Sequence, residues 1–505
     1  MGSKDSEAGK PSEDQRSHVL ALGRHARSGE WPLALEVLED LWAHGCTPST
    51  VTFSAAISAM GKGRQWKIAL GVLSAMQEAA AEPNVFSYSA AISSCEKCGE
   101  WLQALHLLAE MQGDEVEPNV YSFSAAISAC AVDGQWQMAF LVFWGMVSAG
   151  IPPNLITLNA ALTSCEKGAE WQLAVSLLSR MLGFGLTPDV ISFSAAMSAC
   201  AKCGEWQVTL SLLSDSGAAK LVPDTIMSNA AITACEKAGR WQLALHQLST
   251  MPLSSTSPSN ISLNAAISAC EKGSCWQAAL AILFQMFTAL SPNQISFNAS
   301  ISACEKGGQW EMAVQLLSDL LSRGIEANVI SYNAAISACE KALQWKLGLE
   351  LLSAMVACDV TPNVISFSAA ISACEKAKQW EAALALLLGI AVLEIAPSVI
   401  SINAAISACV QALQWQTALH LFANIVEVGP SPTTVSFNAA LAACAGAVQW
   451  QGAMYLLAQM PALKVAPDAF SLDEGLRSLE GSGTWQLVPE LLSSAPLLCH
   501  SLKSS

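Results

Sequence analysis

Residues 51–76 read VTFSAAISAMGKGRQWKIALGVLSAM, and this stretch contains two amphipathic segments separated by a polar turn at residues 63–65. In the first segment, Phe53, Ile57 and Met60 recur at helical spacing on one side. The second segment has an apolar stripe at the same spacing, formed by Trp66, Ala69, Leu70, Leu73 and Met76. The stretch therefore predicts two packed α-helices, and nothing in it favours a β-strand.

The same pattern recurs along the whole chain. Its clearest marker is a tryptophan that begins each second helix: Trp31, Trp66, Trp101, Trp136, Trp171, Trp206, Trp241, Trp276, Trp310, Trp345, Trp380, Trp415, Trp450 and Trp485. Every interval is 35 residues, apart from a step of 34 between Trp276 and Trp310. Self-similarity at this period predicts a solenoid of stacked helix pairs. Because these tryptophans lie on the apolar stripe, we interpret them as core residues.

Composition and length agree with a repeat array. With 52% hydrophobic and 13% charged residues, the chain is too apolar to be disordered, and 505 residues exceed what one globular core holds. The longest apolar run, residues 382–393, lies between Glu381 and Glu394 and is shorter than the roughly 18 residues of a spanning helix. No membrane segment is predicted.

The ends of the chain differ from the array. Residues 1–17 mix acidic and basic side chains, so they resemble neither a signal peptide nor a transit peptide and are predicted to be a disordered tail. Residues 18–495 form the predicted array of about twelve full repeats with degenerate end repeats, and residues 496–505 form a C-terminal tail.

The cysteines follow the period. Eleven of the 17 stand six residues before a repeat tryptophan: Cys95, Cys130, Cys165, Cys200, Cys235, Cys270, Cys304, Cys339, Cys374, Cys409 and Cys444. This regularity favours small buried hydrophobic side chains in a reducing compartment. The pairs Cys95/Cys98 and Cys200/Cys203 have zinc-like spacing, but no second pair or histidine cluster completes four ligands, so no metal site is predicted.

One repeat shows the family that the pattern resembles. Residues 363–387, NVISFSAAISACEKAKQWEAALALL, resemble the pentatricopeptide repeat, with Trp where Leu is more common. The resemblance spans roughly residues 15–500, and the 35-residue period separates it from the 34-residue tetratricopeptide repeat. It implies an all-α fold, a right-handed superhelical α-solenoid of helix-turn-helix repeats.

The resemblance also implies sequence-specific binding of single-stranded RNA, one base per repeat, along the first helices. Two residues per repeat would read the base: a first-helix reader twelve residues before Trp, and a closing reader that ends the repeat. The first-helix and closing readers are Ser54 with Asn84, Ser89 with Asn119, Ser124 with Asn154, Asn159 with Asp189, Ser194 with Asp224, Asn229 with Ser259, Asn264 with Asn293, Asn298 with Asn328, Asn333 with Asn363, Ser368 with Ser398, Asn403 with Thr433, and Asn438 with Asp468.

By family resemblance these pairs predict the target 5′-AAAUGC-YYY-A?-Y?-U-3′, where Y is a pyrimidine and a question mark denotes a base left open. The tenth and eleventh pairs, Ser368 with Ser398 and Asn403 with Thr433, depart from well-defined family combinations, so their bases stay open. Helix capping is the alternative role of the closing readers, which precede the next helix. This alternative is weaker for the first-helix readers, which lie inside a helix, where Asn and Ser have poor helix propensity and no cap to make.

The family resemblance implies roles for two further rows of residues. Base-sandwiching residues stand fifteen before Trp: Val51, Phe86, Tyr121, Ile156, Ile191, Ile226, Ile261, Ile295, Ile330, Ile365, Ile400 and Val435. Their alternative role is packing between repeats. Phosphate contacts are predicted for a lysine series four residues before Trp: Lys62, Lys97, Lys167, Lys202, Lys237, Lys272, Lys306, Lys341 and Lys376. The alternative for these lysines is a cation at a helix C-terminus.

Charge is the main argument against RNA. The chain has 25 Lys and Arg against 41 Asp and Glu, a net charge of −16 at pH 7, whereas nucleic-acid binders usually carry a basic footprint. Seven of the lysines directly follow a glutamate: Glu96, Glu166, Glu236, Glu271, Glu305, Glu340 and Glu375. These glutamates would weaken binding and make it sensitive to salt.

Three function classes follow. The first is RNA binding in organellar RNA processing, stabilisation or translation, in a plastid or mitochondrion by family resemblance, with other RNA-processing proteins as further partners. The alternative is a helical scaffold for protein partners of the tetratricopeptide-like type. An enzyme is disfavoured because the seven histidines share no register and form no deaminase motif. No cofactor, small-molecule substrate or membrane partner is predicted.

Overall fold

The computed structural model describes residues 21–25, 27–43, 48–79, 81–251, 257–393, 395–427 and 431–483. The two predicted tails and Trp485 lie outside these described residues. Within them, regular structure consists of α-helices and one 3-10 turn, with no strand, which confirms the all-α repeat solenoid. None of the described helices combines the length and the apolar character that crossing a membrane requires.

The first compact unit spans Met1–Ser262. Its first helices are α3 (Thr50–Lys62), α5 (Val85–Cys98), α7 (Val120–Asp133), α9 (Leu155–Gly168), α11 (Val190–Cys203) and α13 (Thr225–Lys237). Its second helices are α2 (Trp31–Ala43), α4 (Trp66–Glu78), α6 (Trp101–Gly113), α8 (Trp136–Ser148), α10 (Trp171–Met181), which runs into the 3-10 turn η1 (Leu182–Phe184), α12 (Trp206–Ala218) and α14 (Trp241–Thr250).

The second compact unit spans Leu263–Ser505. Its first helices are α15 (Asn260–Lys272), which begins just before the boundary, α17 (Gln294–Lys306), α19 (Val329–Lys341), α21 (Val364–Lys376), α23 (Val399–Gln411), α25 (Thr434–Gly446) and α27 (Ala469–Ser482). Its second helices are α16 (Trp276–Ala289), α18 (Trp310–Ser322), α20 (Trp345–Ala357), α22 (Trp380–Val392), α24 (Trp415–Glu427) and α26 (Trp450–Ala462).

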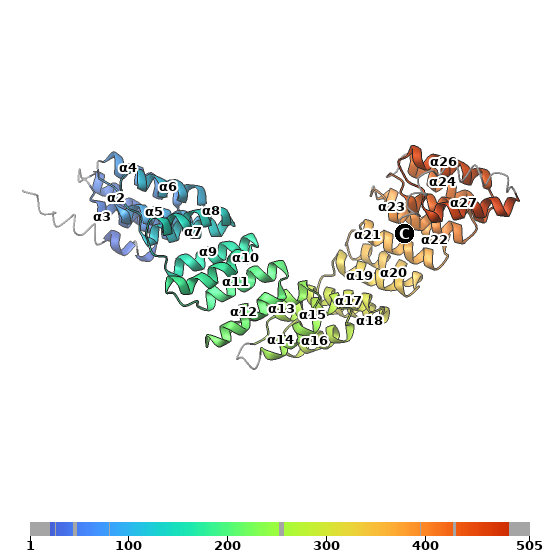
Figure 1. Ribbon diagram of the computed structural model, residues 1–505, viewed down its shortest axis with the longest axis horizontal. Coiled ribbons are helices and arrows are strands. Elements are labelled where there is room, and N and C mark those ends of the chain that lie inside the picture. Colours follow the sequence, from blue (N-terminus) through green and yellow to red (C-terminus); the bar gives the residue numbers. More distant parts are fainter. Residues whose placement is uncertain are drawn as a thin grey trace, which may run out of the picture. The chain divides into compact units, whose positions relative to one another are not determined.

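Inside each unit the helices form two layers. A first helix contacts the first helices of the neighbouring repeats and its own second helix, and the second helix contacts the first helix that follows it (Figure 1). Small side chains make this close packing possible: Ala91 and Cys95 in α5 are fully buried together with Ile92. The first helices therefore form a continuous row whose other face is free of the second helices.

Local sequence sets the ends of the helices. In α5, the side chain of Asn84 accepts hydrogen bonds from the backbone N–H groups of Phe86 and Ser87, which caps the helix at its N-terminus. The same helix ends at Gly99, whose φ of 79° lies in the left-handed region that favours glycine. Each second helix then starts at its tryptophan. The tryptophans are partly exposed and pack on the buried core, as Trp66 and Trp101 do in the first unit, which agrees with their predicted role.

The periodic cysteines are buried thiols, as predicted from their spacing. Burial raises the pKa of Cys374 to about 11 and, with further contributions from Cys203 and Glu205, the pKa of Cys200 to about 12. Cys203 and Cys358 lie in the same array but are exposed. Because the thiolate is the nucleophile, the buried cysteines should be unreactive in the folded protein.

We therefore expect iodoacetamide at pH 8 to alkylate Cys203 and Cys358 while Cys200 and Cys374 stay free. Peptide mass spectrometry after a short reaction measures the modified fraction at each site. The denatured protein is the control, in which all four should react at similar rates. Equal labelling of the four in the folded protein would contradict the burial of the cysteine row.

Candidate nucleic-acid interface

The predicted readers lie along the first helices and the turns that precede them. The closing readers stand at the N-cap position of the following first helix. Eleven of the twelve accept a hydrogen bond from a backbone N–H of that helix through their side chains: Asn84, Asn119, Asn154, Asp189, Asp224, Ser259, Asn293, Asn328, Asn363, Ser398 and Asp468. The capping role considered from the sequence is thus present. It does not exclude ligand contact, because a capping amide or carboxylate keeps further hydrogen-bonding capacity.

Five asparagine readers reach across to their closing partners. The Nδ2 of Asn159 donates to the carboxylate of Asp189 at 3.2 Å, while its Oδ1 accepts from the Oγ of Ser192 at 2.6 Å. Ser192 also donates to Asp189 at 2.8 Å, so the three side chains form a closed hydrogen-bonded triad across two repeats. Asn264, Asn298, Asn333 and Asn438 form the same arrangement with their closing readers and the serine three residues further on.

The aspartate readers are ionised at neutral pH. Partial burial by itself would raise the pKa of Asp189, but hydrogen bonds from the backbone and side chain of Ser192 and from Asn159 outweigh it and lower the pKa below its ordinary value. Asp468 has a lowered pKa for the same combination of reasons, with Ser471 and Asn438 as donors. Both side chains therefore present oxygens that only accept hydrogen bonds.

Serine readers behave differently from asparagine readers. The hydroxyls of Ser54, Ser89, Ser124 and Ser368 donate to the carbonyl four residues earlier in their own helix, at 2.6–2.7 Å. Ser194 donates to the carbonyl of Ile191 at 3.0 Å. Ser89 and Ser368 also contact the next repeat, through the hydroxyls of Ser122 at 2.9 Å and Ser398 at 3.2 Å. The shorter serine side chain leaves more room beside the closing reader than an asparagine does.

Two asparagine readers have no triad. In these repeats a hydroxyl residue, Ser259 or Thr433, takes the place of the closing Asn or Asp. The Oδ1 atoms of Asn229 and Asn403 are buried and have no hydrogen-bond partner among the described residues. A buried acceptor without a donor is unfavourable by about 1–3 kcal/mol. Asn229 and Asn403 therefore lack the serine donor that the other five asparagine readers have.

The predicted base-sandwiching residues are exposed in spite of their apolar character. Their exposed fractions run from 56% at Ile226 to 74% at Phe86. Such exposure argues against the alternative role of packing between repeats, because packing would bury them. In the second unit, Ile400 and Val435 line a groove of about 690 Å³ along α23, α25 and α27, together with Asn403 and Asn438.

Phe470 closes this groove and was missed by the sequence reasoning. It lines the groove together with Val435, and its side chain is 51% exposed. The signal was present, since Phe470 stands fifteen residues before Trp485. Because the last repeat was interpreted as degenerate, the row of base-sandwiching residues was ended at Val435.

The predicted phosphate lysines are engaged in contacts between repeats. Lys62, Lys167 and Lys237 donate to backbone carbonyls of the preceding repeat at 2.7–3.1 Å. Lys306, Lys341 and Lys376 instead form ion pairs of 2.9–3.0 Å with a glutamate of the preceding repeat. Lys202 does both, with Glu166. Lys97 is exposed and has no such contact among the described residues.

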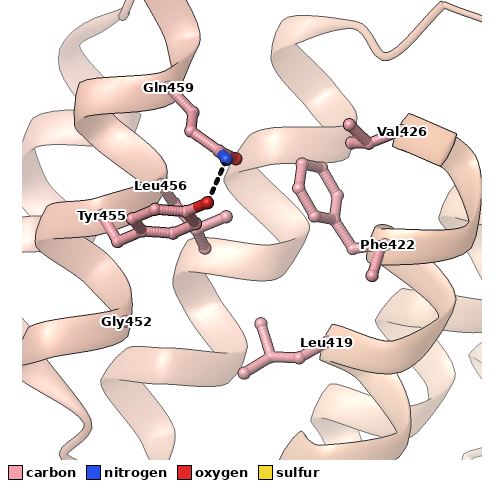
Figure 2. A pocket seen from close by; sticks show the side chains of 8 residues that line it. Leu419, Phe422, Val426, Gly452, Tyr455, Leu456 and Gln459 are labelled. Carbon is pink, nitrogen blue, oxygen red and sulfur yellow. Dashed lines mark hydrogen bonds between the residues drawn. The ribbon is translucent and has the colours of Figure 1, made fainter.

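A second pocket lies on the other layer of the second unit. It measures about 310 Å³ between α24 and α26 and has an apolar lining that includes Leu419, Phe422 and Leu456 (Figure 2). At its rim the amide of Gln459 donates to the hydroxyl of Tyr455 at 2.6 Å. This pocket is separate from the readers, which lie on the first helices.

Family models match the chain in most of its repeats. The pentatricopeptide repeat domain matches residues 37–97, 146–203 and 387–447, the PPR repeat family matches residues 83–132 and 292–341, and the PPR repeat matches residues 121–151 and 330–360. Together these matches cover more than half of the chain. No curated protein matches the sequence significantly.

Solved structures with this fold include the crystal structure of the pentatricopeptide repeat protein PPR10 from maize. It is 18% identical, with a TM-score of 0.59 over 98% of this chain and 75% of that chain. The structure of PPR10 in complex with an 18-nt psaJ RNA element is 19% identical, with a TM-score of 0.47 over 97% and 75% of the two chains. Given the repeat matches and the helix pairs, the chain belongs to the pentatricopeptide repeat family.

Proposed function

We propose that the protein binds single-stranded RNA in a sequence-specific way, with one base read by each pair of first-helix and closing readers. The proposal rests on two features that recur together, once per repeat, on one face. Paired polar side chains are linked across successive repeats, as in the triad of Asn159, Asp189 and Ser192. Exposed apolar side chains such as Ile156 and Ile191 flank them at the same period. Apolar faces and fixed polar atoms are what unstacked bases require.

The chemistry of the closing readers accounts for part of the predicted code. Uracil and guanine present an imino N–H on their Watson–Crick edge, and a carboxylate oxygen of Asp189 or Asp224 can accept from it. Adenine and cytosine present a ring nitrogen acceptor instead, which the amide of Asn84 or the hydroxyl of Ser259 can donate to. The unpartnered Oδ1 of Asn229 fits this scheme, because the exocyclic amine of cytosine is a donor.

The first-helix readers account for the choice between large and small bases. A serine such as Ser194 is drawn back onto its own helix, which leaves space for a purine. An asparagine such as Asn159 extends to the closing reader and favours the smaller pyrimidine. In this proposal the protein acts sterically on an organellar transcript, by protecting, remodelling or recruiting, and has no catalytic step of its own.

Titration against the RNA 12-mer AAAUGCCUUAUU is the test of this proposal. We expect binding at least about tenfold tighter than to a scrambled RNA or to the matching DNA, since one well-placed base contact is worth about 1–3 kcal/mol. Fluorescence anisotropy at 50 and 150 mM salt measures the three dissociation constants. Equal affinity for the three ligands at both salt concentrations would exclude base reading.

A scaffold for proteins is the second candidate, and the apolar pocket between α24 and α26 is the observation in its favour. The two functions use opposite layers of the repeats. Substituting Tyr455, which is 64% exposed at the rim of the pocket, should therefore leave the RNA titration unchanged if RNA is the ligand of the first helices.

A further inference from the structure

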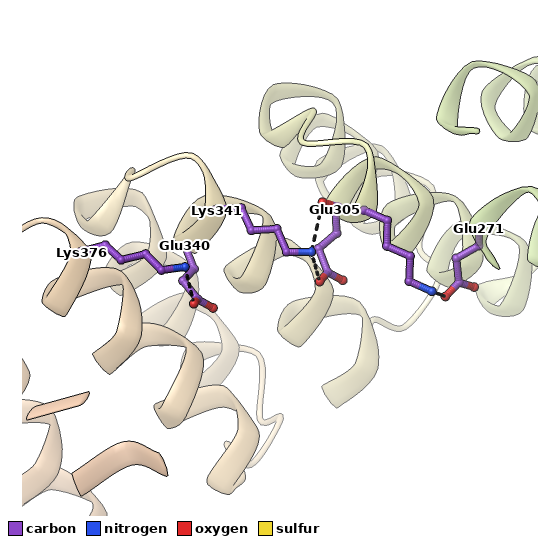
Figure 3. A network of polar contacts seen from close by, with 6 residues as sticks. Glu271, Glu305, Glu340, Lys341 and Lys376 are labelled. Atoms are coloured by element: carbon purple, nitrogen blue, oxygen red, sulfur yellow. Dashed lines mark hydrogen bonds and ion pairs between the residues drawn. The ribbon is translucent and has the colours of Figure 1, made fainter. Parts of the chain in front are cut away.

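The lysine series divides into two classes in the structure. In the second unit, Lys306, Lys341 and Lys376 each place their Nζ atom 2.9–3.0 Å from a carboxylate of the preceding repeat (Figure 3). The partners are Glu271, Glu305 and Glu340, which are only 20–23% exposed. These are regular contacts between repeats, because the same two positions are joined each time.

The other class lacks the acidic partner, and the sequence shows why. The pairing carboxylate stands five residues before the tryptophan of the preceding repeat. In three repeats of the first unit this position is Gly61, Ala131 or Ala201, and the lysines that follow are Lys97, Lys167 and Lys237. Two of these donate to neutral backbone carbonyls at 2.7 Å, and Lys97 is without a described partner.

The two classes differ in the charge that they offer to a phosphate. A lysine bound to a backbone carbonyl keeps its full positive charge, and a phosphate that replaces or joins the carbonyl gains the whole electrostatic attraction. A lysine bound to a glutamate is already neutralised. Phosphate can contact it only by displacing a carboxylate that is tethered to the protein. The freed carboxylate then takes up a cation, so the exchange gives no net release of counterions.

We infer that Glu271, Glu305 and Glu340 compete with RNA phosphates for the lysines of the following repeats. The inference rests on the proposed RNA-binding function. The sequence-independent attraction for RNA then comes mainly from Lys97, Lys167 and Lys237 in the first unit. In the second unit, binding depends on base reading, because phosphate contacts carry no sequence information. The glutamates thus raise specificity by lowering non-specific affinity.

The chain provides a matched control for this inference. Glu96 and Glu375 occupy the same repeat position as the three competing glutamates, but the next repeats have Val132 and Gln411 where the lysine would stand. Consistent with the missing lysine, desolvation raises the pKa of Glu375, with the hydroxyl of Ser407 and the charge of Lys376 acting against it. Removing the charges of Glu96 and Glu375 changes the net charge without releasing a lysine.

The experiment compares the full-length double variants E305Q/E340Q and E96Q/E375Q in titrations against AAAUGCCUUAUU from 50 to 300 mM salt. Each variant removes two negative charges. We expect E305Q/E340Q to bind about tenfold more tightly at 50 mM salt, with a log K against log salt slope steeper by about 1.4, since each new single-strand phosphate contact adds about 0.7. For E96Q/E375Q we expect a gain of about threefold or less and the slope of the unmodified protein.

Specificity provides a second measurement. E305Q/E340Q should gain more affinity for a scrambled 12-mer than for the target, because the released lysines contact any RNA. Equal gains and equal slopes for the two double variants would overturn the inference and leave the proposed function intact. Absence of RNA binding by the unmodified protein would overturn both. Circular dichroism of both variants checks that the helices are unchanged, as expected because surface ion pairs contribute little to stability.

Discussion

Asp189→Asn is expected to change the base preferred at the fourth position of the target from uracil to cytosine. The substitution keeps the shape of the side chain, and Asn caps a helix about as well as Asp does, so α11 should stay intact. It replaces an oxygen that only accepts by an amide that can donate. A donor matches the ring nitrogen of cytosine, whereas it opposes the imino N–H of uracil. One base contact contributes about 1–3 kcal/mol to discrimination between bases, so the preference for U over C should shift about tenfold to a hundredfold.

The measurement is two sets of dissociation constants, one for four 12-mers that differ only at the fourth base and one for four that differ only at the twelfth. Asp468→Asn is the matched variant, because Asp468 forms the same contacts with Asn438 and Ser471 and is predicted to read the twelfth base. Each variant should alter the preference at its own position alone. A change at both positions, or at neither, would refute the assignment of one closing reader to one base.

Phe437→Ala is expected to destabilise the second unit by about 3–5 kcal/mol, as large-to-small substitutions in packed cores do. Phe437 is fully buried in α25, and its ring packs edge-on against Phe422 of the preceding second helix at 4.9 Å between centroids. Because a repeat contacts only its neighbours, the loss should be concentrated in α24, α25 and α26. Hydrogen exchange of these helices, compared with that of α17–α19, measures the local effect.

Phe470→Ala is the control for that experiment. Phe470 is half-exposed in the groove beside Val435, so its removal should change stability by less than about 1 kcal/mol. Stacking of one base on an aromatic ring is worth about 1–3 kcal/mol, so the RNA affinity should fall about tenfold. If Phe470→Ala destabilised α25 as much as Phe437→Ala does, Phe470 would be a core residue and its place in the groove would be wrong.

Much of the candidate interface could be predicted from local pattern. The period of the tryptophans gave the repeat boundaries, and the residue before each first helix was recognised as a cap as well as a reader. In the structure, Asn84 caps α5 and Asp189 caps α11. These features depend on residues within one helix or one turn, where the spacing of side chains along the helix decides the outcome.

Other features could not be predicted because they join residues about one repeat apart. The sequence places Ser192 in the first turn of α11, but only the stacking of α9 on α11 brings its hydroxyl to Asn159. Similarly, each glutamate precedes a lysine of its own helix, and nothing in this local pattern indicates that Glu305 binds Lys341 of the following repeat.

The sequence by itself therefore determined the all-α repeat fold, the start of each second helix and the identity of the capping residues, because helical periodicity and turn chemistry act over a few residues. The tertiary structure decided which asparagines are tied into triads, which apolar side chains remain exposed beside them, and which lysines are neutralised. These outcomes depend on the distance and rotation between stacked helices, which are set by the packing of many small side chains at once.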